Sequence, residues 1–144
     1  MSFFDFSDEV GRATREAKDD VSRLSARTTI GRMRFPDSVA RAGFSLLTPG
    51  RPFSPAAYDH VLVVGVATWS DPDLATLEKL AADSDGRDVK IVVFDLDDWS
   101  LGDILGTFPG VAKFKATPVV LEYRGSDLAL QSEGRDATLW LDRF

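Results

Sequence analysis

The residues with the clearest potential for chemistry follow an apolar stretch in the second half of the chain. Residues 91–94 are Ile-Val-Val-Phe, and Asp95-Leu96-Asp97 comes directly after them. Carboxylates at the end of a strand are potential nucleophiles and potential magnesium ligands. Asp95 and Asp97 form the best catalytic match in the sequence.

Other side chains with catalytic potential are scarce. The chain has no cysteine, which excludes thiol nucleophiles, dithiol exchange, disulfides and thiolate metal sites. His60 is the only histidine, so a Ser-His-Asp triad would need a distant serine and a histidine-rich metal site is excluded. No glycine-rich loop has the spacing and lysine of a phosphate cradle. We therefore expect no metal centre and no cofactor.

The elements that would position these residues follow a strand, helix, strand order. Residues 60–67 and 89–96 are continuous apolar runs of strand length, which is typical of strands buried on both faces. Between them, Ser70 or Asp71 can cap a helix that carries Pro72 in its first turn. The order predicts two parallel strands joined by a right-handed crossover.

The remaining pattern completes an α/β domain. Residues 100–108 suit a short helix, and residues 118–123 and 128–132 predict a β-hairpin. Gly134 and a last helix that runs to Phe144 follow. The order β α β α β β α predicts a mixed four-stranded sheet with helices on both faces.

The residues before this domain have a different character. Apolar side chains at three- and four-residue spacing predict a helix over residues 8–26. Residues 27–55 lose this period and collect prolines, which predicts an extended arm with one short helix near 38–42. We accordingly divide the chain into a helix-plus-arm, residues 1–52, and an α/β domain, residues 53–144. The arm's expected partner-binding residues are Phe3, Phe4, Phe6, Arg27, Arg32 and Arg34.

Charge is distributed unevenly between these two parts. Residues 1–50 hold eight Lys or Arg against seven Asp or Glu, whereas residues 51–144 hold nine against sixteen. Such an asymmetry is typical of an interaction tail, which could bind a separate acidic partner, a neighbouring copy or its own domain. The net charge of -6 and the lack of Arg/aromatic alternation disfavour nucleic acid. No apolar run reaches the length of a membrane span, so we expect a cytosolic protein without a signal peptide.

The order of motifs in residues 53–144 resembles the thioredoxin-like superfamily. That family reads strand, Trp-Cys-Gly-Pro-Cys, helix, strand, helix, then a cis-proline opening a hairpin, a glycine and a final helix. Here Trp69-Ser70-Asp71-Pro72-Asp73 follows the first strand, and Thr117-Pro118 opens the hairpin. The resemblance places Ser70 and Asp73 where the two redox cysteines would stand, and it implies a cis bond before Pro118.

The same resemblance implies that the redox site has been lost. Val64 occupies the position of the buried carboxylate that moves a proton, and serine is a poor nucleophile without a base. The surface around Trp69, Pro72 and Pro118 resembles the family's peptide-binding face, although Trp69 could equally serve packing alone.

We therefore expect a non-catalytic protein that binds protein partners or forms a structural subunit of a larger assembly through its N-terminal arm. A phage or virus particle assembled in the cytoplasm is one such context, and a homo-oligomer is left open. A second hypothesis is a chaperone-like binder of client peptides, similar to the cysteine-less maturation factors of the superfamily.

The third hypothesis is a magnesium-dependent phosphatase that uses Asp95 and Asp97, because the Asp95 segment resembles the opening of haloacid-dehalogenase-type enzymes. The resemblance implies that the first aspartate attacks phosphorus and that both aspartates help to hold magnesium. Trp99 stands where that family has a small or β-branched residue, and fewer than fifty residues remain for its later motifs.

Overall fold

Two consecutive strands, each buried on both faces, form the centre of the fold. The computed structural model describes residues 35–84 and 86–144. Five strands make up the sheet: β1 (Ser45–Leu46), β2 (His60–Val66), β3 (Lys90–Asp95), β4 (Val119–Arg124) and β5 (Asp127–Glu133). The α-helices are α2 (Asp37–Arg41), α3 (Asp71–Asp83), α4 (Leu101–Thr107) and α5 (Gly134–Arg143), and two 3₁₀ turns are η2 (Pro55–Ala57) and η3 (Leu96–Asp98).

The sheet is mixed, and its strand order is β1-β3-β2-β4-β5. Strands β2 and β3 are parallel, as the crossover rule predicts, whereas β4 runs antiparallel to β2 and β5 antiparallel to β4. The four predicted strands and the order of elements along the domain are confirmed. The prediction of only four strands is wrong, because the two residues of β1 add a fifth, paired in parallel with β3.

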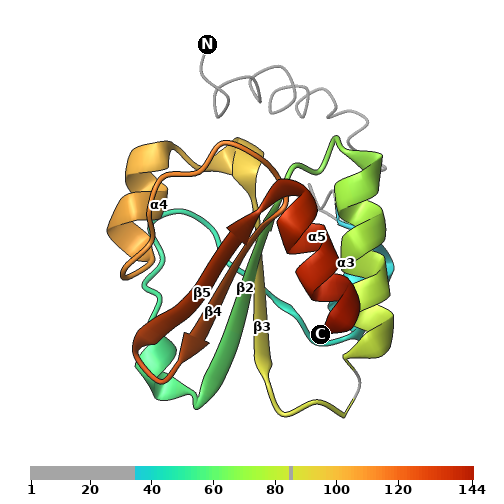
Figure 1. Cartoon of the computed structure of the whole chain (residues 1–144), viewed down its shortest axis with the longest axis horizontal. Helices are drawn as coiled ribbons and strands as arrows, with labels where there is room; N and C mark the ends of the chain where they lie inside the picture. The colour runs from blue at the N-terminus through green and yellow to red at the C-terminus, as the bar shows by residue number, and fades with distance from the viewer. Residues whose placement is uncertain (1–34, 85) are drawn as a thin grey trace.

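Helices cover both faces of this sheet (Figure 1), with α4 on one side and α3 and α5 on the other. Alternate residues of β2 enter different cores: Val61 and Val63 pack on the α4 side, Leu62 and Val64 on the α3 and α5 side. Because side chains alternate across a strand, a strand covered on both faces must be apolar at every position. This requirement explains the continuous apolar run of the sequence.

The described part of the expected arm, residues 35–52, packs against the sheet. Phe35, Phe44 and Leu46 lie against the core on the α3 and α5 side, and Leu47 packs against the other core. The short helix expected near residues 38–42 is present as α2, whose Val39 is buried. Large apolar side chains in this segment can leave water only by adding to the existing cores. The helix expected over residues 8–26 lies outside the described residues.

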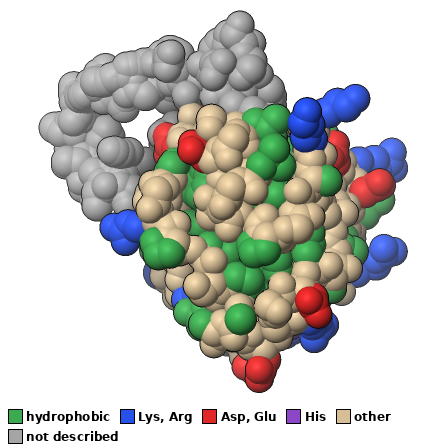
Figure 2. All heavy atoms as spheres, turned by 90° about the vertical axis from the view of Figure 1, so that its left-hand side faces the viewer, with side chains coloured by type: hydrophobic (Ala, Val, Ile, Leu, Met, Phe, Trp, Pro, Cys, Tyr) green, Lys and Arg blue, Asp and Glu red, His purple; other side chains and the backbone are tan. Residues whose placement is uncertain are grey.

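Helix α4 covers one face of the sheet. Ser100 begins the helix with a capping box, because its side chain accepts from the Asp103 amide while the Asp103 carboxylate accepts from the Ser100 amide. Figure 2 shows this side, where hydrophobic side chains gather over the middle of the face and charged ones lie at its rim.

In the described part of the chain, no helix is both long and apolar enough to cross a bilayer.

A buried tyrosine fixes the turn after α4. Tyr123 is fully buried on β4, and its hydroxyl donates a 2.7 Å hydrogen bond to the carbonyl oxygen of Pro109. Burial raises the pKa of the Tyr123 phenol above its usual range, because the anion would be poorly solvated there. Tyr123 therefore acts as a neutral hydrogen-bond donor that ties the end of α4 to the sheet.

Gly65 on β2 provides a stability test of this core. A Cβ atom at position 65 would lie 2.5 Å from the ring of Phe94, which is itself fully buried. We expect Gly65→Ala to lower the free energy of unfolding by about 1–3 kcal/mol through overpacking. Gly106→Ala is the matched control, because a Cβ atom at that position on α4 would meet nothing within 4 Å and alanine favours a helix. Urea denaturation of both variants measures the difference, and equal stabilities would contradict the packing described for β2.

Candidate functional site

The loop between β2 and α3 contains the residues that the resemblance aligns with a redox motif. Ser70 precedes α3 as its N-cap, and its hydroxyl accepts a 3.4 Å hydrogen bond from the Asp73 amide. The Asp73 carboxylate is only 3% exposed and accepts a 3.0 Å hydrogen bond from the Ala67 amide. Ser70 and Asp73 therefore close the first turn of α3 and tie it to the end of β2.

Two further aspartates, Asp95 at the end of β3 and Asp97 in η3, hold the same loop. Asp95 is 3% exposed, and its carboxylate accepts from the hydroxyl of Thr68 and from the amide of Asp97, each at 3.0 Å. Asp97 is 5% exposed, and its Oδ1 accepts a 3.3 Å hydrogen bond from the indole Nε1 of Trp69. We call Thr68, Asp95 and Asp97 the brace of the Trp69 loop, because they join residues that are 27 and 28 positions apart.

This arrangement bears on the phosphatase hypothesis. Asp95 and Asp97 accept hydrogen bonds from protein donors within the brace and are almost entirely buried. Within residues 35–84 and 86–144, no group of three or more His, Cys, Asp or Glu side chains is placed to hold a metal ion. The geometry thus gives the Asp-X-Asp pair a bracing role in the fold, and the phosphatase hypothesis gains no support from it.

The brace presents Trp69 at the surface. The Trp69 side chain is 57% exposed although its indole nitrogen is hydrogen-bonded, so the ring is held in place while it faces solvent. Pro72, in the first turn of α3, is also exposed. Tryptophan is one of the residues enriched at the energetic centres of protein interfaces.

Pro118 lies at the same edge of the sheet as this loop. The Thr117–Pro118 peptide bond is cis, as the resemblance implies, and the Pro118 carbonyl accepts a 2.8 Å hydrogen bond from Gly134. Val119 pairs with Gly65, which places Pro118 beside the end of β2 from which the Trp69 loop emerges. Pro118 is buried, however, so of the three residues expected on this face only Trp69 and Pro72 offer exposed surface.

The other predicted site residues fall elsewhere. Val64, at the position that the resemblance gives to the family's buried carboxylate, is fully buried in the apolar core. Its hydrocarbon side chain has no group that could transfer a proton. The six arm residues Phe3, Phe4, Phe6, Arg27, Arg32 and Arg34 lie outside the described residues. Sequence reasoning missed Thr68, whose role becomes visible only when its distant acceptor Asp95 is placed beside it.

Restoring cysteines tests the assignment of positions 70 and 73. An N-cap residue and the third residue of its helix are about 5–6 Å apart between Cα atoms, which is the separation that a disulfide prefers. We expect the double variant Ser70→Cys/Asp73→Cys to form an intramolecular disulfide under mild oxidation, detected as loss of both free thiols without dimer formation. The two single variants serve as controls, and thiols that stay free in the folded double variant would contradict the assignment.

The comparisons with known proteins concern the fold. No protein-family model and no curated protein sequence matches the chain. Among solved structures, it is similar to thioredoxin f2 of Chlamydomonas reinhardtii, with 19% identity, 69% of this chain and 93% of that chain covered, and a TM-score of 0.47. A chloroplastic thioredoxin z is similar at 20% identity, with coverages of 70% and 96% and a TM-score of 0.45. A mutant thioredoxin from Halobacterium salinarum is similar at 19% identity, with coverages of 67% and 90% and a TM-score of 0.42.

The order of the elements and the strand directions identify the fold. A parallel pair joined through α3, then α4, an antiparallel hairpin opened by Pro118 and a final helix after Gly134 is the order expected from the motifs. The chain therefore has a thioredoxin-like fold that contains no cysteine.

Proposed function

We propose that this chain is a non-catalytic protein-binding module whose contact surface is centred on Trp69. The observation that carries the proposal is the combination of 57% exposure with a fixed indole nitrogen, held by a buried aspartate. Exposure to solvent alone does not call for a fixed orientation of the Trp69 ring, whereas binding of a partner is favoured by one. A pre-oriented ring loses less conformational entropy on binding than a mobile one.

The absence of cysteine supports binding over thiol chemistry. Ser70 and Asp73, at the positions that the resemblance gives to the redox cysteines, use their polar atoms at the helix start. These hydrogen bonds hold the loop without any thiol. A loop held in this way is suited to recognition of a polypeptide.

Site-specific cross-linking tests the proposal. We would introduce a photoactivatable benzoylphenylalanine in place of Trp69 and, as a control, in place of Leu139, which is 46% exposed on α5. In the cells that make the protein, we expect position 69 to form adducts that position 139 does not form. The same adducts from both positions, or none from position 69, would contradict the proposal.

The kind of partner separates the structural-subunit and chaperone-like versions of this function. A single folded partner, found at fixed stoichiometry, supports a subunit of an assembly, of which a virus particle is one example. Many partners that cross-link only while unfolded support the binding of client peptides. Both versions use the same surface, so the adduct's identity distinguishes them.

The N-terminal arm is proposed as a second anchor. Residues 1–34 hold seven Lys or Arg against six Asp or Glu, whereas residues 35–144 hold ten against seventeen. We expect deletion of residues 1–34 to abolish incorporation into the assembly while the domain stays folded. The cut is placed at residue 34 because the residues from Phe35 onward pack on the sheet. Normal incorporation of the truncated chain would contradict a role of the arm as an anchor. If the arm instead binds its own domain, deletion of residues 1–34 would change the free energy of unfolding of that domain.

A further inference from the structure

A basic cavity lies at the end of β2 that is opposite the Trp69 loop. His60 begins β2, whereas Trp69 follows its last residue, so the two sites are separated by the length of a seven-residue strand. The cavity has a volume of about 390 Å³. Its lining residues come from β2, β4, the loop before β3 and the end of α5: His60, Arg87, Glu122, Arg124, Trp140, Arg143 and Phe144.

Three arginines from different segments share this lining. Arg87, Arg124 and Arg143 line the cavity together with Glu122 and Phe144, the last residue. With the Phe144 carboxylate of the 144-residue chain included and His60 counted as neutral, the lining has an excess of one positive charge. Such an excess is unusual on a domain whose residues 35–144 hold seventeen acidic against ten basic side chains. Three of those ten basic residues therefore converge on a single cavity, although charge repulsion alone would spread them apart.

Local contacts hold Arg87 and Arg124 beside the cavity. Glu122 accepts a 2.8 Å hydrogen bond from His60 Nε2 and a 3.3 Å hydrogen bond from Arg124. The guanidinium of Arg87 lies 4.2 Å from the centre of the Phe144 ring and donates to the Phe144 carbonyl oxygen. A guanidinium has five N–H donors, so each of these arginines keeps donors for a ligand.

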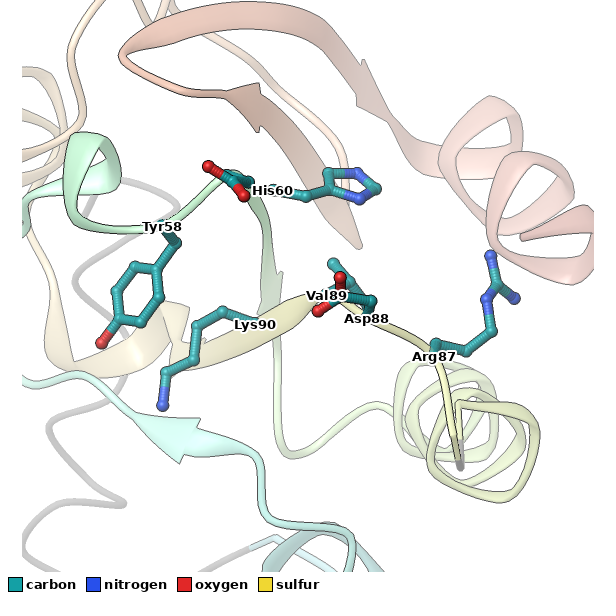
Figure 3. Close-up of a pocket in the computed structure, with 7 residues that line it drawn as sticks. Tyr58, His60, Arg87, Asp88, Val89 and Lys90 are labelled. Atoms are coloured by element: carbon teal, nitrogen blue, oxygen red, sulfur yellow. The ribbon is translucent and has the colours of Figure 1, made fainter.

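A neighbouring cavity of about 290 Å³, drawn in Figure 3, shares His60 and Arg87 with the basic cavity. In that view the His60 ring and the Arg87 side chain point toward the space beside α5, whereas Tyr58 and Lys90 lie at the other end. Asp59 and Asp88 line this neighbouring cavity, where they balance its cations. Arg87 lines both cavities, whereas Arg124 and Arg143 line only the basic cavity on the α5 side.

We propose that the basic cavity binds a phosphate group, which Arg87, Arg124 and Arg143 hold through charge-assisted hydrogen bonds. A phosphate monoester carries nearly two negative charges at neutral pH and has three acceptor oxygens, so it offers acceptors to all three guanidinium groups. Planar guanidinium groups bind phosphate oxygens in pairs. The carbonyl end of α5 contributes about half a negative charge, which is smaller than the excess of one positive charge.

The test uses the full 144-residue chain, labelled with ¹⁵N, and titrates it with sodium phosphate against a sodium chloride series of equal ionic strength. We expect saturable shifts of the Arg124 amide and the Trp140 indole with phosphate and none with chloride. A phosphoserine peptide is titrated in parallel. Tighter binding of the peptide than of free phosphate means that a polypeptide carries the group, and equal binding means that the site reads the phosphate alone; both support the proposal.

Matched variants locate the binding. We expect Arg124→Gln and Arg143→Gln each to weaken phosphate binding roughly tenfold, because each removes hydrogen bonds to a charged group. Arg135→Gln is the control, since Arg135 is exposed on the same helix as Arg143 but does not line the cavity. The proposal is overturned by the absence of saturable shifts, or by an equal loss in Arg135→Gln, which would indicate general charge attraction. Neither result bears on the Trp69 surface.

Discussion

Replacement of Asp95 by alanine is expected to lower the free energy of unfolding by about 2–4 kcal/mol, which is a large part of the stability of a small domain. Asp95 is buried and accepts from the Thr68 hydroxyl and the Asp97 amide. Alanine leaves both donors inside the protein without that acceptor, and a buried donor that loses its partner carries the full cost of desolvation. Urea denaturation monitored by circular dichroism measures the change.

Asparagine at the same position separates the brace from a catalytic role. The carbonyl of the asparagine side chain would accept from the Asp97 amide, and its NH₂ group would donate to the Thr68 hydroxyl, which can reverse its role. We therefore expect Asp95→Asn to lose only about 1 kcal/mol of stability. Asp142→Asn, on the exposed side of α5, is the control and should be neutral. Hydrolysis of an aryl phosphate by the wild type that disappears in Asp95→Asn would revive the phosphatase hypothesis, and equal stability of the alanine and asparagine variants would contradict the brace.

Replacement of Trp69 by alanine is expected to weaken binding of the cross-linked partner roughly thirtyfold or more, with little change in stability. Tryptophan dominates many interfaces because it buries a large rigid surface at low entropic cost. The side chain is more than half exposed in the free protein, so its loss removes little core packing. Isothermal titration calorimetry with the purified partner measures the affinity.

The control for this variant is another exposed apolar residue. Leu139→Ala removes a large side chain from α5, far along the chain from the Trp69 loop, and we expect it to change affinity less than about threefold. Asp97→Ala keeps the Trp69 ring but removes the acceptor of its indole nitrogen, so an intermediate loss of affinity is expected. If Trp69→Ala and Leu139→Ala bind the partner equally well, the proposed surface is wrong.

The central strands could be predicted because their sequence reflects their own burial. Strands β2 and β3 are covered on both faces, so each is apolar at nearly every position. The starts of helices α3 and α4 are indicated by Ser70 and Ser100, which cap them in the structure. In these elements, the local pattern and the tertiary environment agree.

Strand β1 could not be predicted, since its two residues have no pattern of their own. Ser45 and Leu46 are extended because they lie beside Val92 and Val93 of β3. This pairing depends on the tertiary fold, which brings two segments that are far apart in the sequence next to each other. The same limit applies to the arm, because the local pattern assigns its apolar residues after Phe35 to a linker, whereas they lie in the cores.

The candidate site could be predicted in part. The resemblance identifies the Trp69 loop and the positions of the lost cysteines, but it places Pro118 on an exposed face, whereas Pro118 is buried. The local pattern of Asp95 and Asp97, at the end of β3 and directly after it, favours a catalytic pair. Their role in holding Trp69 depends on donors 27 and 28 residues earlier, which no local pattern reveals.

Hydrogen exchange of the free protein and of its complex with the cross-linked partner tests the central claim most directly. The account predicts slower exchange of backbone amides in residues 67–73 and in the turn that contains Asp97, with little change in α5 and β5. Protection confined to residues 1–34, or spread over α5 and β5 with none in the Trp69 loop, would contradict the claim that this loop is the binding surface.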